Sequence, residues 1–191
     1  MSCLYRNMQL VVINGPGGCG KDTFIDFCED ILDVDEFDTV RAIKEAAEIL
    51  GWNGKKDEKS RQFLHDLKML SVKYNDLPFT DLKNYVDFLE NNANHVDYPD
   101  LLFVHVREKE EIDRIVEELG AVKLLITAER EDYIEPDLDF ERETKDINYD
   151  FHICNDGTLV DLENKAKRFC ELMEELINED ITLSDIGYIQ L

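Results

Sequence analysis

The chain has 191 residues and a formal charge of −23 at neutral pH, with 43% hydrophobic and 34% charged residues. This length suffices for one domain that buries a full core. A surface so acidic repels polyanions, so we expect neither nucleic acids nor anionic membranes as partners. No apolar stretch has the length needed to span a bilayer, and no secretory signal begins the sequence, which predicts a cytoplasmic protein.

The five cysteines are widely spaced and odd in number. They lack the pairing typical of a metal site or a disulfide framework, so we expect reduced thiols. A nucleotide is an anion as well, and this acidic chain can bind one only at a local group of basic residues. Each lysine and arginine near a phosphate-binding motif is therefore informative.

The strongest local pattern is an apolar run at 10–13 that leads into a glycine-rich loop, followed by an amphipathic helix over about 21–32. Glycines let a backbone turn tightly with its N–H groups inward, and a helix N-terminus beside a lysine adds positive charge. Gly15 and Gly20-Lys21 have the Walker A spacing. We predict that the loop binds nucleotide phosphates through Gly15, Gly17, Gly18, Cys19, Gly20, Lys21, Asp22 and Thr23.

Asp22 departs from the Walker A pattern, which asks for Ser or Thr after the lysine. Three roles are open to Asp22: binding Mg²⁺ directly, binding it through a water, or capping the helix N-terminus. Thr23 supplies a hydroxyl one position later. We therefore predict Asp22 and Thr23 as the residues nearest a magnesium ion.

The next part of the chain predicts a short strand at 37–40 and then mostly helices. A helix over 41–51 ends at Gly51, a longer one follows over about 58–74, and a third lies near 82–89. The second helix has an apolar stripe, and its other face carries basic residues that either contact phosphate or are solvated. The apolar stripe consists of Phe63, Leu64, Leu67 and Leu70, and the basic face consists of Arg61, His65 and Lys68.

The C-terminal half alternates apolar strands with helices. Strands are predicted at 101–107, 121–128 and 151–155, with a helix over 108–119 and a closing helix after the last strand. Such crossovers are right-handed and give a parallel sheet. We predict an α/β, three-layer P-loop NTPase fold, with about five parallel strands and helices on both faces. The tail 181–191 is expected to form an edge strand or a contact within a homodimer.

The segment 129–150 is polar and irregular and contains Arg130 and Arg142. It is either a surface loop or a lid. Long loops without structure are uncommon in compact domains, and lids of phosphate-transfer enzymes follow sheet strands, so a lid is the interpretation we favour. The expected organisation is one domain over 1–191, with a helical, acceptor-binding insertion at about 41–98 and this lid.

Four short segments, in the same order, carry a resemblance to a known family: Gly20-Lys21-Asp22-Thr23, Ile43-Lys44-Glu45-Ala46, Arg107 with Glu111, and Asn155-Asp156-Gly157-Thr158-Leu159. They resemble segments of the phage-type deoxynucleoside monophosphate kinases. Related P-loop kinases, including animal-type phosphomevalonate kinases, share part of the Gly-Lys-Asp feature. The resemblance spans most of the chain, although the middle helices match only loosely.

The resemblance implies ATP-dependent phosphoryl transfer to a nucleoside or deoxynucleoside monophosphate, with ATP and Mg²⁺ as cofactors. Lys21 would bridge the β and γ phosphates, and Arg130 or Arg142 would close over the transferring group. The residues implied around the acceptor are Ile43, Lys44, Arg61, His105, Arg107 and Glu111.

His105 departs from the family pattern, which has an aspartate two residues before the strand-end arginine. A carboxylate there could orient the acceptor or a metal-bound water, whereas a histidine does so in one protonation state only. Two further hypotheses follow. The acceptor can be another small phosphorylated molecule, or the protein can bind nucleotide without transferring phosphate.

Overall fold

The structure is a computed structural model that describes residues 8–55, 57–93, 98–129, 146–178, 181–182, 185 and 187–191. The chain divides into two compact units. Unit 1 comprises Met1–Glu36 and Pro99–Leu191, and unit 2 comprises Phe37–Tyr98.

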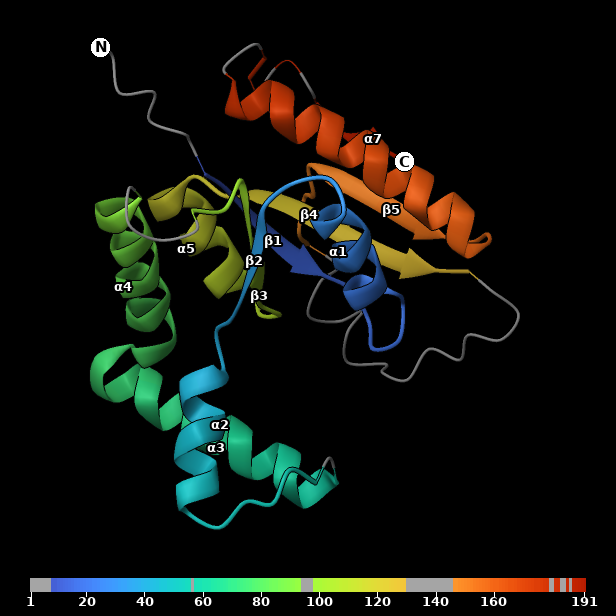
Figure 1. Cartoon of the computed structure of the whole chain (residues 1–191). Coiled ribbons are helices and arrows are strands. Elements are labelled where there is room, and N and C mark those ends of the chain that lie inside the picture. Colours follow the sequence, from blue (N-terminus) through green and yellow to red (C-terminus); the bar gives the residue numbers. More distant parts are fainter. Residues whose placement is uncertain are drawn as a thin grey trace. The chain divides into compact units, whose positions relative to one another are not determined.

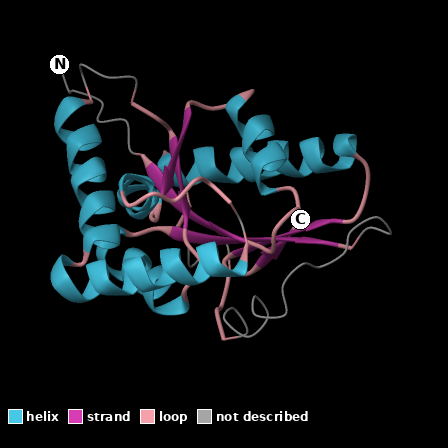
Figure 2. Ribbon diagram, turned by 90° about the horizontal axis from the view of Figure 1, so that it is seen from below, coloured by secondary structure: helices cyan, strands magenta, loops and turns pink. Residues whose placement is uncertain are grey.

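A six-stranded sheet runs through the structure in the order β2-β3-β1-β4-β5-β6, and the pairs β1–β3, β1–β4, β4–β5 and β5–β6 are parallel. The predicted α/β fold with helices on both faces of a parallel sheet is confirmed (Figure 1, Figure 2). The strands are β1 (Gln9–Asn14), β2 (Val34–Asp38), β3 (Leu101–His105), β4 (Val122–Ala128), β5 (Phe151–Asn155) and β6 (Ile189–Gln190).

The tail forms β6 beside β5 at the edge of the sheet, which confirms the edge-strand alternative for 181–191 and brings the predicted number of about five strands to six. One strand differs from the sequence prediction in its bounds. Strand β2 begins at Val34, within the acidic run, and not at Phe37 as predicted. The reason is its place at the edge of the sheet, because an edge strand tolerates charged side chains that an inner strand excludes. The N–H of Leu101 donates to the carbonyl of Asp33 at 3.1 Å, next to the start of β2.

Three helices cover the sheet of unit 1: α1 (Lys21–Glu29), α5 (Lys109–Leu119) and α7 (Leu159–Ile177). Helices α1 and α7 pack against each other over one face, and α5 lies against the other face (Figure 1). Phe169 of α7 is fully buried, and its ring centroid lies 5.5 Å from that of Phe24 and 5.3 Å from that of Phe151. These rings fill the core between α1, α7 and the sheet, so they fix the helix that follows the glycine-rich loop.

The described residues of unit 2 form three helices: α2 (Arg41–Ile49), α3 (Glu58–Asn75) and α4 (Leu77–Asn92). Helix α2 ends at Ile49, and the predicted stop, Gly51, lies two residues beyond it. The N–H of Gly51 donates to the Glu48 carbonyl at 2.9 Å and that of Trp52 to the Ala47 carbonyl at 2.8 Å, which is the Schellman arrangement. At the start of α2, the Arg41 guanidinium lies 4.9 Å from the ring centroid of Phe37, a cation–π contact.

The prediction of the apolar stripe on α3 is wrong toward the C-terminal end of the helix. Leu70 is 63% exposed, whereas Lys68, assigned to the basic face, is only 8% exposed. Lysine can bury its long aliphatic stem along apolar neighbours, which explains how it takes a packed position. Arg61 and His65 are exposed, so the expected basic face is divided.

We predict that Thr158→Ala lowers the free energy of unfolding by about 1 kcal/mol, because it removes the N-cap of α7. The Thr158 hydroxyl accepts from the Asp161 N–H, and an Asp161 carboxylate oxygen accepts from the Thr158 hydroxyl and N–H, at 2.7 Å each. These bonds lower the pKa of Asp161, so their contribution is present at neutral pH and is lost as pH falls through that lowered pKa. Urea unfolding measures the change.

Thr158→Ser is the control, because it keeps the hydroxyl. Equal stability of the alanine and serine variants at pH 7 would contradict the capping role.

Candidate functional site

The glycine-rich loop lies at the carboxyl edge of the sheet, between β1 and α1. Strand β1 has β3 on one side and β4 on the other, so the chain connections diverge from it in opposite directions. In open parallel sheets, ligands bind at such a switch point, outside the carboxyl ends of the strands. The topology thus places the predicted phosphate loop where this class of sheet binds ligands.

Two glycines of the loop have no room for a side chain. A Cβ on Gly15 would lie 2.3 Å from the Ile126 carbonyl oxygen of β4, and one on Gly20 would lie 2.5 Å from Nδ2 of Asn155. Both residues also have positive φ, +151° and +103°. Glycine is required at these positions because the backbone must lie directly against β4 and against the end of β5.

Asn155 holds the loop from the end of β5. Its side chain is 4% exposed, and Nδ2 donates to the Cys19 carbonyl at 2.9 Å. Cys19 is a residue of the loop and is fully buried, and burial raises the pKa of its thiol. A protonated, buried thiol is a poor nucleophile, so Cys19 contributes its backbone and its packing to the loop.

Lys21 is the first residue of α1, and its ammonium group lies over the loop. Nζ donates to the carbonyl oxygens of Gly15 at 2.7 Å and of Pro16 at 2.9 Å. Nζ also donates to Sγ of Cys19 at 3.9 Å, so three atoms of the loop hold the ammonium group in place. The arrangement places a full positive charge at the N-terminus of α1, where the helix dipole is also positive.

Asp22 and Thr23 follow in the first turn of α1. The N-cap of α1 is Gly20, which has no side chain, so Asp22 is not the cap. Asp22 is exposed and Thr23 half-buried. Among the described residues, no three His, Cys, Asp or Glu side chains gather closely enough to hold a metal ion. This donor set fits Mg²⁺, which is commonly bound by one or two protein oxygens together with substrate phosphates and water.

A second group of residues joins the ends of β1 and β3. Asn14, the last residue of β1, is 3% exposed, and its Nδ2 donates to the Tyr149 hydroxyl at 3.1 Å and to the Arg107 carbonyl at 3.5 Å. Burial raises the pKa of the Tyr149 hydroxyl, so it is neutral at physiological pH. The backbone of Arg107 is therefore tied to the strand that precedes the loop. Glu111 is half-buried in the first turn of α5.

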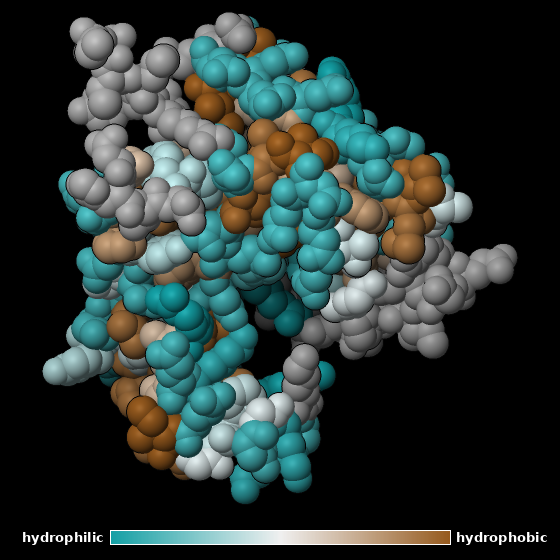
Figure 3. All heavy atoms as spheres, viewed as in Figure 1, coloured by the Kyte–Doolittle hydropathy of each residue, from teal (hydrophilic) through white to brown (hydrophobic). Residues whose placement is uncertain are grey.

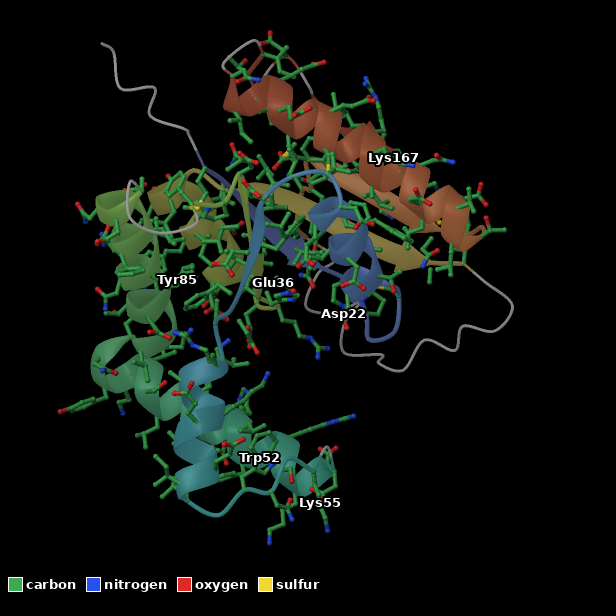
Figure 4. All side chains as sticks on the ribbon, in the orientation of Figure 1. Asp22, Glu36, Trp52, Lys55, Tyr85 and Lys167 are labelled. Carbon is green, nitrogen blue, oxygen red and sulfur yellow. The ribbon has the colours of Figure 1, made fainter. Side chains whose placement is uncertain are left out.

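His105 ends β3 and is paired with a carboxylate from β2. Its Nε2 lies 2.6 Å from Oε2 of Glu36, and the side chains are 26% and 44% exposed. His105 is in register with Ile13, two residues before Gly15, so the pair lies near the loop. Figure 4 labels Glu36 and Asp22. Glu36 was missed by the sequence analysis, since an acidic run after a helix gives no sign that it forms a strand.

The residues predicted to hold the acceptor in unit 2 have different surroundings. Ile43 is 2% exposed and belongs to the packed side of α2. Lys44, on the same helix, donates to an Asp38 carboxylate oxygen at 2.5 Å. Arg61 is exposed in the first turn of α3. Residues 41–73 carry eight Lys and Arg against five Asp and Glu, a formal charge of +3 in a chain of −23.

The lid prediction falls mainly outside the described residues. Arg130 and Arg142 lie outside them, and so does the rest of 130–145. Residues 146–150 lead into β5, where Asp150 accepts a hydrogen bond from the Lys123 N–H at 2.8 Å. The role of the two arginines thus stays a prediction. Among the helices that the structure describes, none is long and apolar enough to cross a membrane.

Comparison with known proteins adds little to this site. No family model matches the sequence, and no curated protein matches it. Among solved structures, a cysteine mutant of the APS kinase CysC from Mycobacterium tuberculosis matches with 13% identity and a TM-score of 0.41, over 88% of this chain and 98% of that one. An apo GTPase from Pyrococcus abyssi matches with 14% identity and a TM-score of 0.36, over 86% and 74%. Similarity this low assigns no activity, so the function rests on the loop and its surroundings.

Proposed function

We propose that the protein binds ATP at the glycine-rich loop and transfers its γ-phosphoryl group to a nucleoside or deoxynucleoside monophosphate. The observation that supports this proposal best is the position of Lys21. Its ammonium group is bonded to the Gly15 and Pro16 carbonyls at the start of α1, within a loop whose backbone is held by β4 and Asn155. A fixed cation beside inward-facing N–H groups is what the binding of a phosphate chain requires.

The chain's own groups would act mainly by position and charge, since phosphoryl transfer needs little covalent chemistry from the protein. The ammonium group of Lys21 would hold the β and γ phosphate oxygens, and the N–H groups from Gly17 to Thr23 would hold the rest of the phosphate chain. Asp22 and Thr23 would bind Mg²⁺ directly or through water. When bound, Mg²⁺ neutralises charge on the phosphate oxygens.

Arg107, in unit 1, is proposed for the phosphate of the acceptor. A monophosphate oxygen is already anionic at neutral pH, so the acceptor needs no general base. Basic residues are most informative in this acidic protein, and the charge of +3 over 41–73 supports an anion-binding role for that segment.

The Glu36–His105 pair supports a kinase over a protein that only binds nucleotide. It brings a carboxylate to the end of β3, where the sequence alone shows a histidine. A carboxylate there can orient the acceptor or a water on the metal. A non-nucleotide phosphorylated acceptor stays an alternative, and the acceptor panel below decides between them.

We predict that the wild-type protein forms ADP from ATP and Mg²⁺ only when an acceptor from a panel of mono- and deoxymononucleotides is present. Lys21→Ala should lower this rate about 100-fold or more, because it removes a charge that stabilises the transferring group. A coupled ADP assay measures both. Lys167→Ala is the matched control, because that lysine is exposed on α7 and paired with Glu163.

Two outcomes of this assay would contradict the proposal. ATP binding without acceptor-dependent ADP would leave a nucleotide-binding protein, and near-normal turnover of Lys21→Ala would place the active site elsewhere. ADP formation with a phosphomevalonate-type substrate alone would support the other acceptor class.

Asn155→Ala should raise the Kd for ATP about tenfold and lower the Tm, because it leaves the buried Cys19 carbonyl without its bond from Nδ2. Calorimetric titration and thermal unfolding measure the two effects. Asn148→Ala removes an exposed amide and serves as the control. Unchanged ATP affinity in Asn155→Ala would show that the clamp from β5 does not shape the loop.

Glu36→Gln keeps the size of the side chain but removes its charge. We expect kcat to fall about tenfold, because the acceptor loses a carboxylate that orients it, while the Kd for ATP stays unchanged. Glu29→Gln, an exposed acid at the end of α1, is the control. A change in ATP affinity with unchanged kcat would instead indicate a structural role for the Glu36–His105 pair.

A further inference from the structure

Unit 2 contains a pocket of about 340 Å³ between the end of α2 and the start of α3, which we call the Trp52 pocket. The residues that line it are Leu50, Gly51, Trp52, Asn53, Lys55, Asp57, Lys59, Ser60 and Phe63. Small-molecule sites commonly enclose roughly 300–1,000 Å³. The Trp52 pocket is at the lower end of that range and suits one ligand of about mononucleotide size.

The side of the pocket formed by the α2–α3 connection is held by backbone hydrogen bonds. The Schellman bond from the Trp52 N–H to the Ala47 carbonyl, at 2.8 Å, folds the chain back over α2. The indole Nε1 of Trp52 donates to the Lys55 carbonyl at 3.1 Å, which fixes the ring and the backbone of Lys55 together. Trp52 and Lys55 are labelled in Figure 4. This wall is therefore formed before a ligand binds.

The opposite side is the first turn of α3. Asp57 caps the helix by accepting from the Ser60 N–H at 2.9 Å. Lys59 and Phe63 are four residues apart and therefore lie on one face of the helix. The cap fixes the start of the helix, so both residues are presented to the pocket from a regular element.

The lining combines apolar rings with positive charge. Trp52 and Phe63 are half-buried, Lys55 and Lys59 are exposed, and Leu50 is 65% exposed at the rim. Figure 3 shows apolar surface next to hydrophilic surface over this part of the molecule. The Asp57 carboxylate also lines the pocket, and its bond to the Ser60 N–H keeps it ionised, but the two lysines outnumber it. Aromatic rings bind planar bases by stacking, and ammonium groups bind phosphate.

We propose that the Trp52 pocket binds a nucleoside monophosphate, with its base stacked on Trp52 and its phosphate held by Lys55 and Lys59. The pocket lies within the segment 41–73 that carries the positive charge. Because the proposed function assigns the acceptor phosphate to Arg107, which does not line this pocket, the Trp52 pocket is a second monophosphate site, and the two sites can be tested separately.

Trp52 is the only tryptophan of the chain, so its fluorescence reports on this pocket alone. Titration of the wild-type protein with deoxynucleoside monophosphates should quench it saturably. Lys55→Ala/Lys59→Ala should raise the Kd about tenfold, because two charged contacts to phosphate are lost. The charge-matched control, Lys73→Ala/Lys83→Ala, changes two exposed lysines outside the pocket and should leave the Kd unchanged.

A second pair of variants tests stacking by calorimetric titration. Trp52→Leu should raise the Kd about fivefold or more, as expected for loss of base stacking, and Trp52→Phe should raise it less. Unchanged affinity in both Trp52→Leu and Lys55→Ala/Lys59→Ala would contradict the proposal that the Trp52 pocket binds the monophosphate. Loss of quenching in Lys21→Ala would also overturn it, because the signal would then arise from the phosphate loop.

The ADP assay separates this proposal from the proposed function. Quenching that obeys the predictions above, without acceptor-dependent ADP, would support the pocket and contradict the kinase. Transfer to a monophosphate without any quenching of Trp52 would support the kinase and overturn the pocket.

Discussion

The close approach of the Gly15 backbone to β4 is the constraint on which the loop depends. A Cβ at this residue would lie 2.3 Å from the Ile126 carbonyl oxygen, so only glycine fits at the position where the chain leaves β1. Asn155 then holds the Cys19 carbonyl from β5, and Lys21 closes over the Gly15 and Pro16 carbonyls. The loop is thus fixed by separate elements of one sheet. Such preorganisation lowers the cost of binding a phosphate chain.

The features predicted from the sequence are those with a local cause. Buried parallel strands read as continuous apolar runs, and the loop is visible because its glycines and lysine keep a fixed spacing. The prediction failed where the environment overrides the local pattern. Val34 begins β2 within an acidic run because that strand lies at the sheet edge, and Lys68 is buried where Leu70 is exposed because lysine can pack along its aliphatic stem.

Contacts between distant parts of the chain could not be predicted in this way. Glu36 and His105 are 69 residues apart, and Asn14 and Tyr149 are 135 apart, yet each pair meets near the carboxyl ends of the strands. The spacing of apolar residues along the chain cannot predict such a contact, because the contact depends on the order of strands in the sheet. His105 read alone suggested the loss of a carboxylate. Its pairing with Glu36 shows that a carboxylate is present at that edge, supplied by the neighbouring strand.

The acidic surface limits which groups can account for nucleotide binding in the two candidate regions. At physiological ionic strength, charges separated by more than about 8 Å are largely screened, so the net charge of −23 acts only weakly on a nucleotide that is not in contact with the protein. Affinity must then come from groups in direct contact. Unit 1 offers a helix N-terminus and Lys21, which suit a phosphate without a base. Unit 2 offers Trp52 beside two lysines, which suit a ring and a phosphate together. The two proposed sites therefore depend on different contacts within one acidic chain.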